Sequence, residues 1–117
     1  GMVCQLFSET ALTKLILSDG TAPFGMFADS FTDSLKSGKA SFYYLCDNNK
    51  FKVKSNYDTG QTYAVNTLLA TVPSGTNQGK LTPATNYAAQ PTVAIVMEAP
   101  SSASDDDFMI IQTDLQY

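Results

Sequence analysis

The sequence contains no histidine, no arginine and no tryptophan, and all seven basic residues are lysine. Without histidine, the chain alone builds neither a Ser-His-Asp triad nor a Cys-His pair, and it has no histidine ligands for zinc. Two cysteines are too few for a four-cysteine zinc site. The glycines Gly60, Gly75 and Gly79 fit neither a P-loop nor a dinucleotide-binding fingerprint. We therefore expect a protein that is not an enzyme and that has no cofactor and no metal centre.

Charge is sparse as well. Charged residues make up 15% of the chain, against about 25% in typical domains, and the net charge is −4. An acidic chain repels phosphate backbones, and arginine, the best bidentate phosphate ligand, is missing. Nucleic acid is therefore not an expected partner.

Long hydrophobic runs are also absent. The longest, Val93–Met97, is far shorter than the ~20 residues that span a bilayer, and no secretory leader is recognisable. We expect no signal peptide, no transmembrane segment and no membrane partner. Cys4 and Cys46 are interpreted as reduced, mostly buried thiols, because secreted disulfide scaffolds carry more cysteines. A disulfide between these two residues is the alternative.

What the chain does contain is enough apolar sequence for one core. It has 117 residues, 44% of them apolar, which predicts a single domain over 1–117. Gly1, which precedes Met2, is interpreted as the remnant of an expression tag. Short apolar segments separated by Gly, Pro and Asn turns favour an all-β barrel or sandwich over β-α-β units. We predict a small, strongly bent barrel of about 5–7 short strands, because closure removes exposed edges.

One segment departs from the strand pattern. Residues 8–17 are predicted to form a short N-terminal helix, with Ser8 as its cap and apolar positions at a helical period. The turn-forming cluster Ser18–Pro23 ends it. A strand through Leu15–Leu17 is the competing interpretation.

The clearest hairpin joins Ser41–Cys46 to Lys50–Ser55 through Asp47–Asn49, whose residues tolerate positive φ. Lysines alternate with Phe51 and Val53, so the lysines are expected to face water. Further strands are predicted over 24–27, 63–69, 80–82, 92–98 and 107–113. The side chains expected to be largely buried are Phe42, Tyr44, Phe51, Val53, Val65, Leu69, Val93, Ile95, Met109 and Ile111.

Two acidic candidates for binding or catalysis are visible. Asp105–Asp107 supply oxygen ligands for a hard cation such as Ca²⁺, but the triplet lacks the alternating spacing of an EF-hand. A solvated acidic turn is the preferred interpretation. Glu98, at the end of an apolar strand, is interpreted as a surface acid, because no second carboxylate is apparent for acid–base catalysis.

A third candidate is basic. Lys50, Lys52 and Lys54 lie on one side of their strand, and Tyr43 and Tyr44 belong to the neighbouring one. Aromatic stacking combined with cations is typical of single-stranded nucleic-acid binding. The acidity of the whole chain favours the alternative, an exposed sheet face that lysine keeps soluble.

The second half of the chain resembles a known family. The segments YDTGQTYAVNTLL, GKLTPA, QPTVAIVMEAP and DDFMIIQ, within 57–113, are similar to the C-terminal barrel of virion structural proteins from marine tailed bacteriophages. In that family an aromatic-x-Val-Gly-x-Leu segment precedes a Gly-Lys-Leu/Val-Thr turn, and this chain has Asn66 in place of the first Gly. The resemblance implies a capsid-decoration-like virion component that acts through its surfaces and brings no functional residues.

A helix followed by short, bent strands is also similar to Sm-like and SH3-like barrels. Sm-like proteins form rings through edge strands, and many bind RNA. Asp47–Asn49 is the nearest match to their first RNA-binding loop, and Gly79-Lys80 is a reversed trace of the second. The sequence therefore predicts a homo-oligomeric assembly protein, with capsid proteins as candidate partners and the virion, otherwise the cytoplasm, as its location. An oligomeric RNA-binding module is the alternative, which fold analogy alone does not establish.

Overall fold

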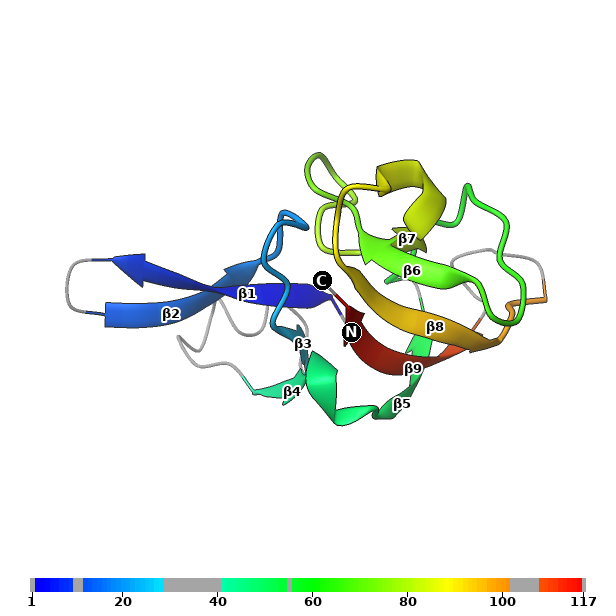
Figure 1. Cartoon of the computed structure of the whole chain (residues 1–117), viewed down its shortest axis with the longest axis horizontal. Coiled ribbons are helices and arrows are strands. Elements are labelled where there is room, and N and C mark those ends of the chain that lie inside the picture. The colour runs from blue at the N-terminus through cyan, green and yellow to red at the C-terminus, as the bar shows by residue number, and fades with distance from the viewer. Residues whose placement is uncertain (1, 10–11, 29–40, 55, 102–107, 117) are drawn as a thin grey trace.

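The computed structural model describes residues 2–9, 12–28, 41–54, 56–101 and 108–116, and these residues fold into two antiparallel sheets (Figure 1). The first sheet has the order β2-β1-β3-β4, with strands β1 (Val3–Glu9), β2 (Leu12–Leu17), β3 (Gly25–Phe27) and β4 (Phe42–Tyr44). The second has the order β5-β9-β8-β6-β7, with strands β5 (Lys50–Lys54), β6 (Leu68–Thr71), β7 (Leu81–Pro83), β8 (Thr92–Glu98) and β9 (Phe108–Gln116). Two short 3-10 turns, η1 (Leu45–Asp47) and η2 (Ala84–Tyr87), complete the described elements. The prediction of an all-β chain is confirmed.

The predicted N-terminal helix is wrong, because Ser8 and Glu9 end strand β1 and Leu12–Leu17 form strand β2. Its pairing runs from Cys4 opposite Leu17 to Glu9 opposite Leu12. A helix over 8–17 would fall below the ~12–15 residues that hold helical structure alone, whereas the hairpin joins a sheet through β3. The competing strand through Leu15–Leu17 is the interpretation that the structure supports.

The β1–β2 hairpin extends away from the rest of the molecule (Figure 1). Strand β3 pairs with β1 only at Val3 and Cys4, so its support ends near the base of the hairpin. Among the described residues, β1 beyond Cys4 and the outer side of β2 have no further strand partner. The hairpin is therefore an arm joined to a compact body.

The predicted hairpin between Ser41–Cys46 and Lys50–Ser55 is also wrong. Strand β4 pairs with β3, and β5 pairs with β9, so the two segments enter different sheets. The physical reason is Leu45, which is fully buried at the start of η1. Its burial places η1 against the core, and the chain between β4 and β5 therefore does not form a tight hairpin turn. The turn chemistry was predicted correctly, since Asn48 has a left-handed φ of 53°.

The two described sheets do not close into a barrel, so the predicted closure is wrong. Strands β4 and β5 are each the last strand of their sheet, and the chain between them forms η1 instead of pairing them. The alternation along β5 is confirmed, with Lys50, Lys52 and Lys54 exposed and Val53 buried.

A single core lies between the elements. Its buried members are Val3, Met26, Leu45, Val53, Tyr57, Tyr63, Leu69, Leu81, Val93, Ala94, Val96, Met109 and Ile111. Burial is thus confirmed for Val53, Leu69, Val93, Met109 and Ile111. Phe42, Phe51 and Ile95 are only partly buried.

Two predicted core residues are exposed. Tyr44 is 48% exposed because β4 is the last strand of its sheet, and Val65 is 59% exposed because it lies in a turn that precedes β6. Within that turn Asn66 has a φ of 73°, and its backbone N–H donates to Val96 O over 2.8 Å. Asparagine tolerates this left-handed geometry better than most residues other than glycine.

Tyr63 is a core residue whose hydroxyl group forms a hydrogen bond. Its ring meets Tyr57 edge-on, with centroids 5.3 Å apart, and its hydroxyl donates to Asp58 O over 2.7 Å. Burial raises the pKa of Tyr63 well above its ordinary value of 10.0, and the nearby Asp58 carboxylate adds to the rise. The folded state therefore retains the phenol proton at a pH where the unfolded chain loses it.

We expect stability to depend on this proton at alkaline pH. A raised folded-state pKa means full stabilisation below pH 10.0 and a progressive loss as the pH rises beyond it. Tyr63→Phe should cost about 1 kcal/mol at neutral pH through the lost hydrogen bond, but its unfolding free energy should then decline less above pH 10.0. Urea unfolding from pH 8 to about 11 measures both slopes. Identical slopes would contradict the assigned role of Tyr63.

Candidate functional site

The structure brings two of the predicted basic and aromatic elements together, although their strands are not paired. The rings of Tyr43 and Phe51 pack with centroids 4.9 Å apart. Beside them is a hollow of about 260 Å³, lined by Met26, Phe27, Ala28, Tyr43, Phe51, Lys52 and Val53. A lysine and an exposed tyrosine therefore share one surface between the two sheets.

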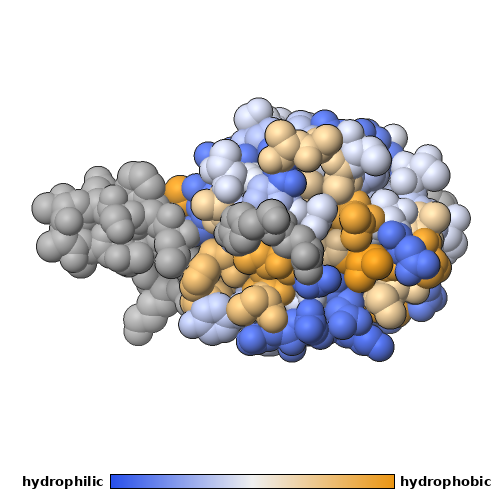
Figure 2. All heavy atoms as spheres, in the orientation of Figure 1, coloured by the Kyte–Doolittle hydropathy of each residue, from blue (hydrophilic) through white to orange (hydrophobic). Residues whose placement is uncertain are grey.

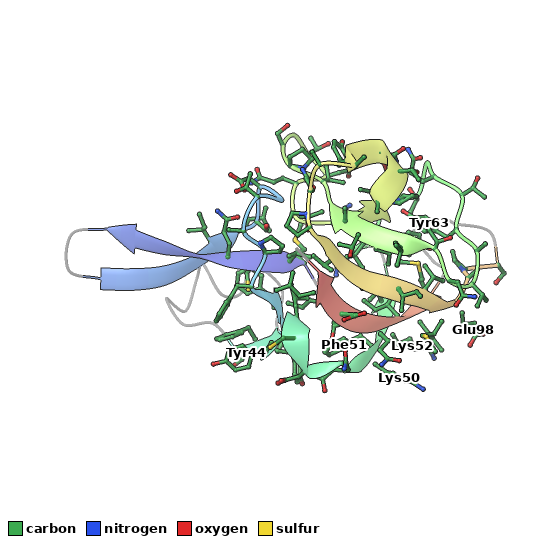
Figure 3. All side chains as sticks on the ribbon, in the orientation of Figure 1. Tyr44, Lys50, Phe51, Lys52, Tyr63 and Glu98 are labelled. Carbon is green, nitrogen blue, oxygen red and sulfur yellow. The ribbon has the colours of Figure 1, made fainter. Side chains whose placement is uncertain are left out.

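Tyr44 lies apart from this hollow, as the stick view shows (Figure 3). Neighbouring residues of a strand point to opposite faces, so Tyr44 joins Phe42 on the face opposite to Tyr43. There Phe24, Phe42 and Tyr44 form a cluster with centroids 5.1 to 5.4 Å apart. A Cβ at Gly25 would lie 2.8 Å from Phe42 Cδ2, so this cluster packs tightly against the glycine. Of the two tyrosines named with the lysines, only Tyr43 lines the hollow together with a lysine, Lys52.

The outward face of the second sheet is a surface that the sequence did not reveal. Residues directly opposite each other in an antiparallel sheet share a face. The buried residues of the sheet, Val53, Met109, Ile111, Val96 and Leu69, mark its inner side. The residues of the alternate register, Lys50, Lys52, Ile95, Leu68, Glu98, Ile110 and Gln112, form what we name the outer face.

Exposed apolar side chains lie on the outer face and next to it. Leu68, a member of the outer face, is 51% exposed, and Met97, within the register shift between Val96 and Glu98, is 39% exposed. Figure 2 shows hydrophobic side chains on this side of the body, above a margin of hydrophilic ones. Next to Leu68 is a mainly apolar hollow of about 430 Å³, lined by Thr67, Leu68, Pro83, Ala84, Thr85 and Ala88. The outer face is therefore amphipathic.

The outer face could not be predicted from the pattern of apolar residues in β8. A continuous apolar run such as that over 92–98 is typical of a strand that is buried on both faces, but the burial in the structure is mixed, with Val93, Ala94 and Val96 buried and Met97 and Glu98 exposed. Glu98 is thus a surface acid, as interpreted, and it lies at the same margin of the molecule as Lys50 and Lys52 (Figure 3). Asp105–Asp107 lie outside the described residues.

The two cysteines have different environments. Both are free thiols, but Cys4 is buried and Cys46 is exposed, so the expectation of burial is wrong for Cys46. Burial raises the pKa of the Cys4 thiol from 9.0 to about 11. Cys4 is therefore a protonated thiol of the interior at neutral pH and a poor nucleophile.

Within the described ranges, no three residues of the types His, Cys, Asp and Glu come together as a metal site would require. No protein-family model, curated protein or solved structure matches this chain. In the same part of the chain, no helix has the length and hydrophobicity to span a membrane. The candidate functional sites are accordingly surfaces: the outer face, the hollow beside Tyr43 and the arm.

Proposed function

We propose that this chain is a non-enzymatic structural protein of the virion-assembly type, which works by binding copies of itself and capsid proteins through sheet surfaces. The observation that carries the proposal is the outer face, where Leu68 is exposed, with the exposed Met97 next to it, on a chain with few charges. Exposed apolar patches of this kind, bordered by polar residues, are typical of protein–protein contacts.

The arm supports the same function. A two-stranded hairpin is marginally stable in water unless a further strand or a packed surface covers it. Unpaired strand edges also form hydrogen bonds readily with another chain. Within the part of the chain that the structure describes, the β1–β2 hairpin has no strand partner beyond its contact with β3 at Val3 and Cys4. Contact with a partner would stabilise it.

Sedimentation velocity over a wide concentration range tests the proposal. We expect the sedimentation coefficient to increase with concentration as oligomers form, and the protein to bind isolated capsid shells. A chain that remains monomeric at the highest concentration and does not bind shells would refute the assembly function. The same runs at high salt separate apolar contacts from charged ones, because salt screens the latter.

A second function, an oligomeric RNA-binding module, is favoured by one observation. Tyr43, Phe51 and Lys52 line the same hollow, which places a stacking ring beside a cation. Fluorescence anisotropy with labelled single-stranded RNA at low salt distinguishes the two functions. Affinity that falls with salt and with Lys50→Glu plus Lys52→Glu would favour RNA binding. Absence of binding at low salt would leave assembly as the function.

A further inference from the structure

We infer that two copies of this chain pack outer face to outer face around a two-fold axis. The axis runs parallel to β9 and lies between the two outer faces. This inference rests on the proposed assembly function and adds the partner, the surface and the orientation. It is carried by one row of residues across three strands, in which Lys52, Ile110 and Glu98 are cross-strand neighbours.

The row arises directly from the register. Lys52 of β5 is opposite Ile110 of β9, and Ile110 is in turn opposite Glu98 of β8. Strands in a sheet are spaced about 4.8 Å apart, so the lysine and the carboxylate lie about 10 Å apart with an isoleucine between them. Both charged residues are exposed, and Ile110 is partly buried. The row thus has a cation at one end, an anion at the other and an apolar centre.

Such a row is complementary to itself under two-fold symmetry. Rotation about an axis along β9 places the β5 side of one copy over the β8 side of the other. Lys52 of each copy then faces Glu98 of the other copy, and the two Ile110 side chains meet on the axis. A two-fold interface requires this self-complementarity, because the same patch serves both copies. The pairing of two sheets by their faces, with strands nearly aligned, is a common packing arrangement.

The adjacent row fits the same arrangement across β5, β9 and β8, whereas Leu68 on β6 lies beyond the overlap because β5 is the last strand of its sheet. Lys50, Gln112, Ile95 and Leu68 follow one another across β5, β9, β8 and β6. After the rotation Lys50 lies over Ile95 of the other copy, where its aliphatic stem can cover the isoleucine while its ammonium group remains in water. Ion pairs at exposed sites contribute little to affinity, so the apolar residues supply the attraction and the charges select the orientation.

Charge reversal followed by a charge swap tests the orientation. We expect Lys52→Glu and Glu98→Lys each to weaken self-association at least tenfold, since each places like charges opposite one another twice in the dimer. The double variant restores opposite charges and should recover the wild-type dissociation constant to within about threefold. Sedimentation equilibrium measures the constants. Lys80→Glu, before β7 at the opposite edge of the sheet, controls for the change in net charge, and circular dichroism verifies that each variant is folded.

The outcomes separate the two proposals. If the wild-type chain forms oligomers and both single charge reversals leave its dissociation constant unchanged, the outer-face dimer is overturned and the assembly function remains. Loss of association in the double variant as well as in both single variants would also overturn the paired geometry. A wild-type chain that is monomeric throughout would refute self-association and with it the dimer. Recovery in the double variant, with no effect of Lys80→Glu, would establish the orientation.

Discussion

Ile111→Ala will lower the free energy of unfolding by about 2–5 kcal/mol. Ile111 is fully buried in the second sheet, where β9 lies between β5 and β8. It is opposite Phe51 on one side and Val96 on the other, so its side chain contributes to the core from the middle of three strands. Truncation leaves a cavity that strands held by their hydrogen bonds cannot fill.

Ile95→Ala is the matched control. It removes the same atoms from the next strand, but Ile95 belongs to the outer face and is only partly buried. We expect a loss of about 1 kcal/mol, because less apolar area leaves contact with the protein and no closed cavity forms. Urea unfolding followed by circular dichroism measures both variants. Equal losses would mean that the inner and outer faces of the second sheet are wrongly assigned.

Gly79→Ala will destabilise the fold by about 2–5 kcal/mol, the sum of a backbone cost and a packing cost. Gly79 has a left-handed φ of 83° and is buried. A Cβ there would overlap Leu17 Cδ1 and lie 2.8 Å from Leu17 Cγ. The same residue accepts a hydrogen bond from Val3 N over 2.8 Å and donates to Val72 O over 3.0 Å. Gly79 thus connects the base of the arm to the body.

Gly75→Ala separates the two costs. Gly75 has nearly the same φ, 84°, but no atom of the described residues lies within 4 Å of an added Cβ. Its replacement should therefore cost only the left-handed backbone penalty, about 1–2 kcal/mol. The difference between the two variants isolates the contact with Leu17, and Leu17→Ala should reduce the effect of Gly79→Ala. Equal losses at the two glycines would exclude that contact as a source of destabilisation.

Local signals predicted the local features well. The alternation of lysines with Phe51 and Val53 is a period-2 pattern, and it correctly predicted which side of β5 faces water. Asn48 could be placed in a turn because its short polar side chain tolerates positive φ. The burial of Met109 and Ile111 followed from an apolar segment bounded by turns.

Partner choice between strands was not predictable from these signals. The helix expected over 8–17 assumed that this segment is stabilised by contacts within itself, and the hairpin expected around Asp47–Asn49 assumed that two neighbouring strands pair with each other. In the structure β2 pairs with β1, and β5 pairs with β9 from the far end of the chain. The energy of strand pairing comes from contacts with other strands, and the sequence of one strand does not show which strand it will contact. For the same reason Val65 could not be recognised as a turn residue.

Composition and alternation act residue by residue, so they were enough to predict the strand-rich fold class and to exclude histidine and arginine chemistry. The position of the candidate site depends instead on how the strands pair in space. Lys52 and Glu98 become neighbours of the same Ile110 through two strand pairings and a register shift. None of these three features can be recognised from the sequence of a single strand. A surface composed of three strands exists only after those strands have found their register.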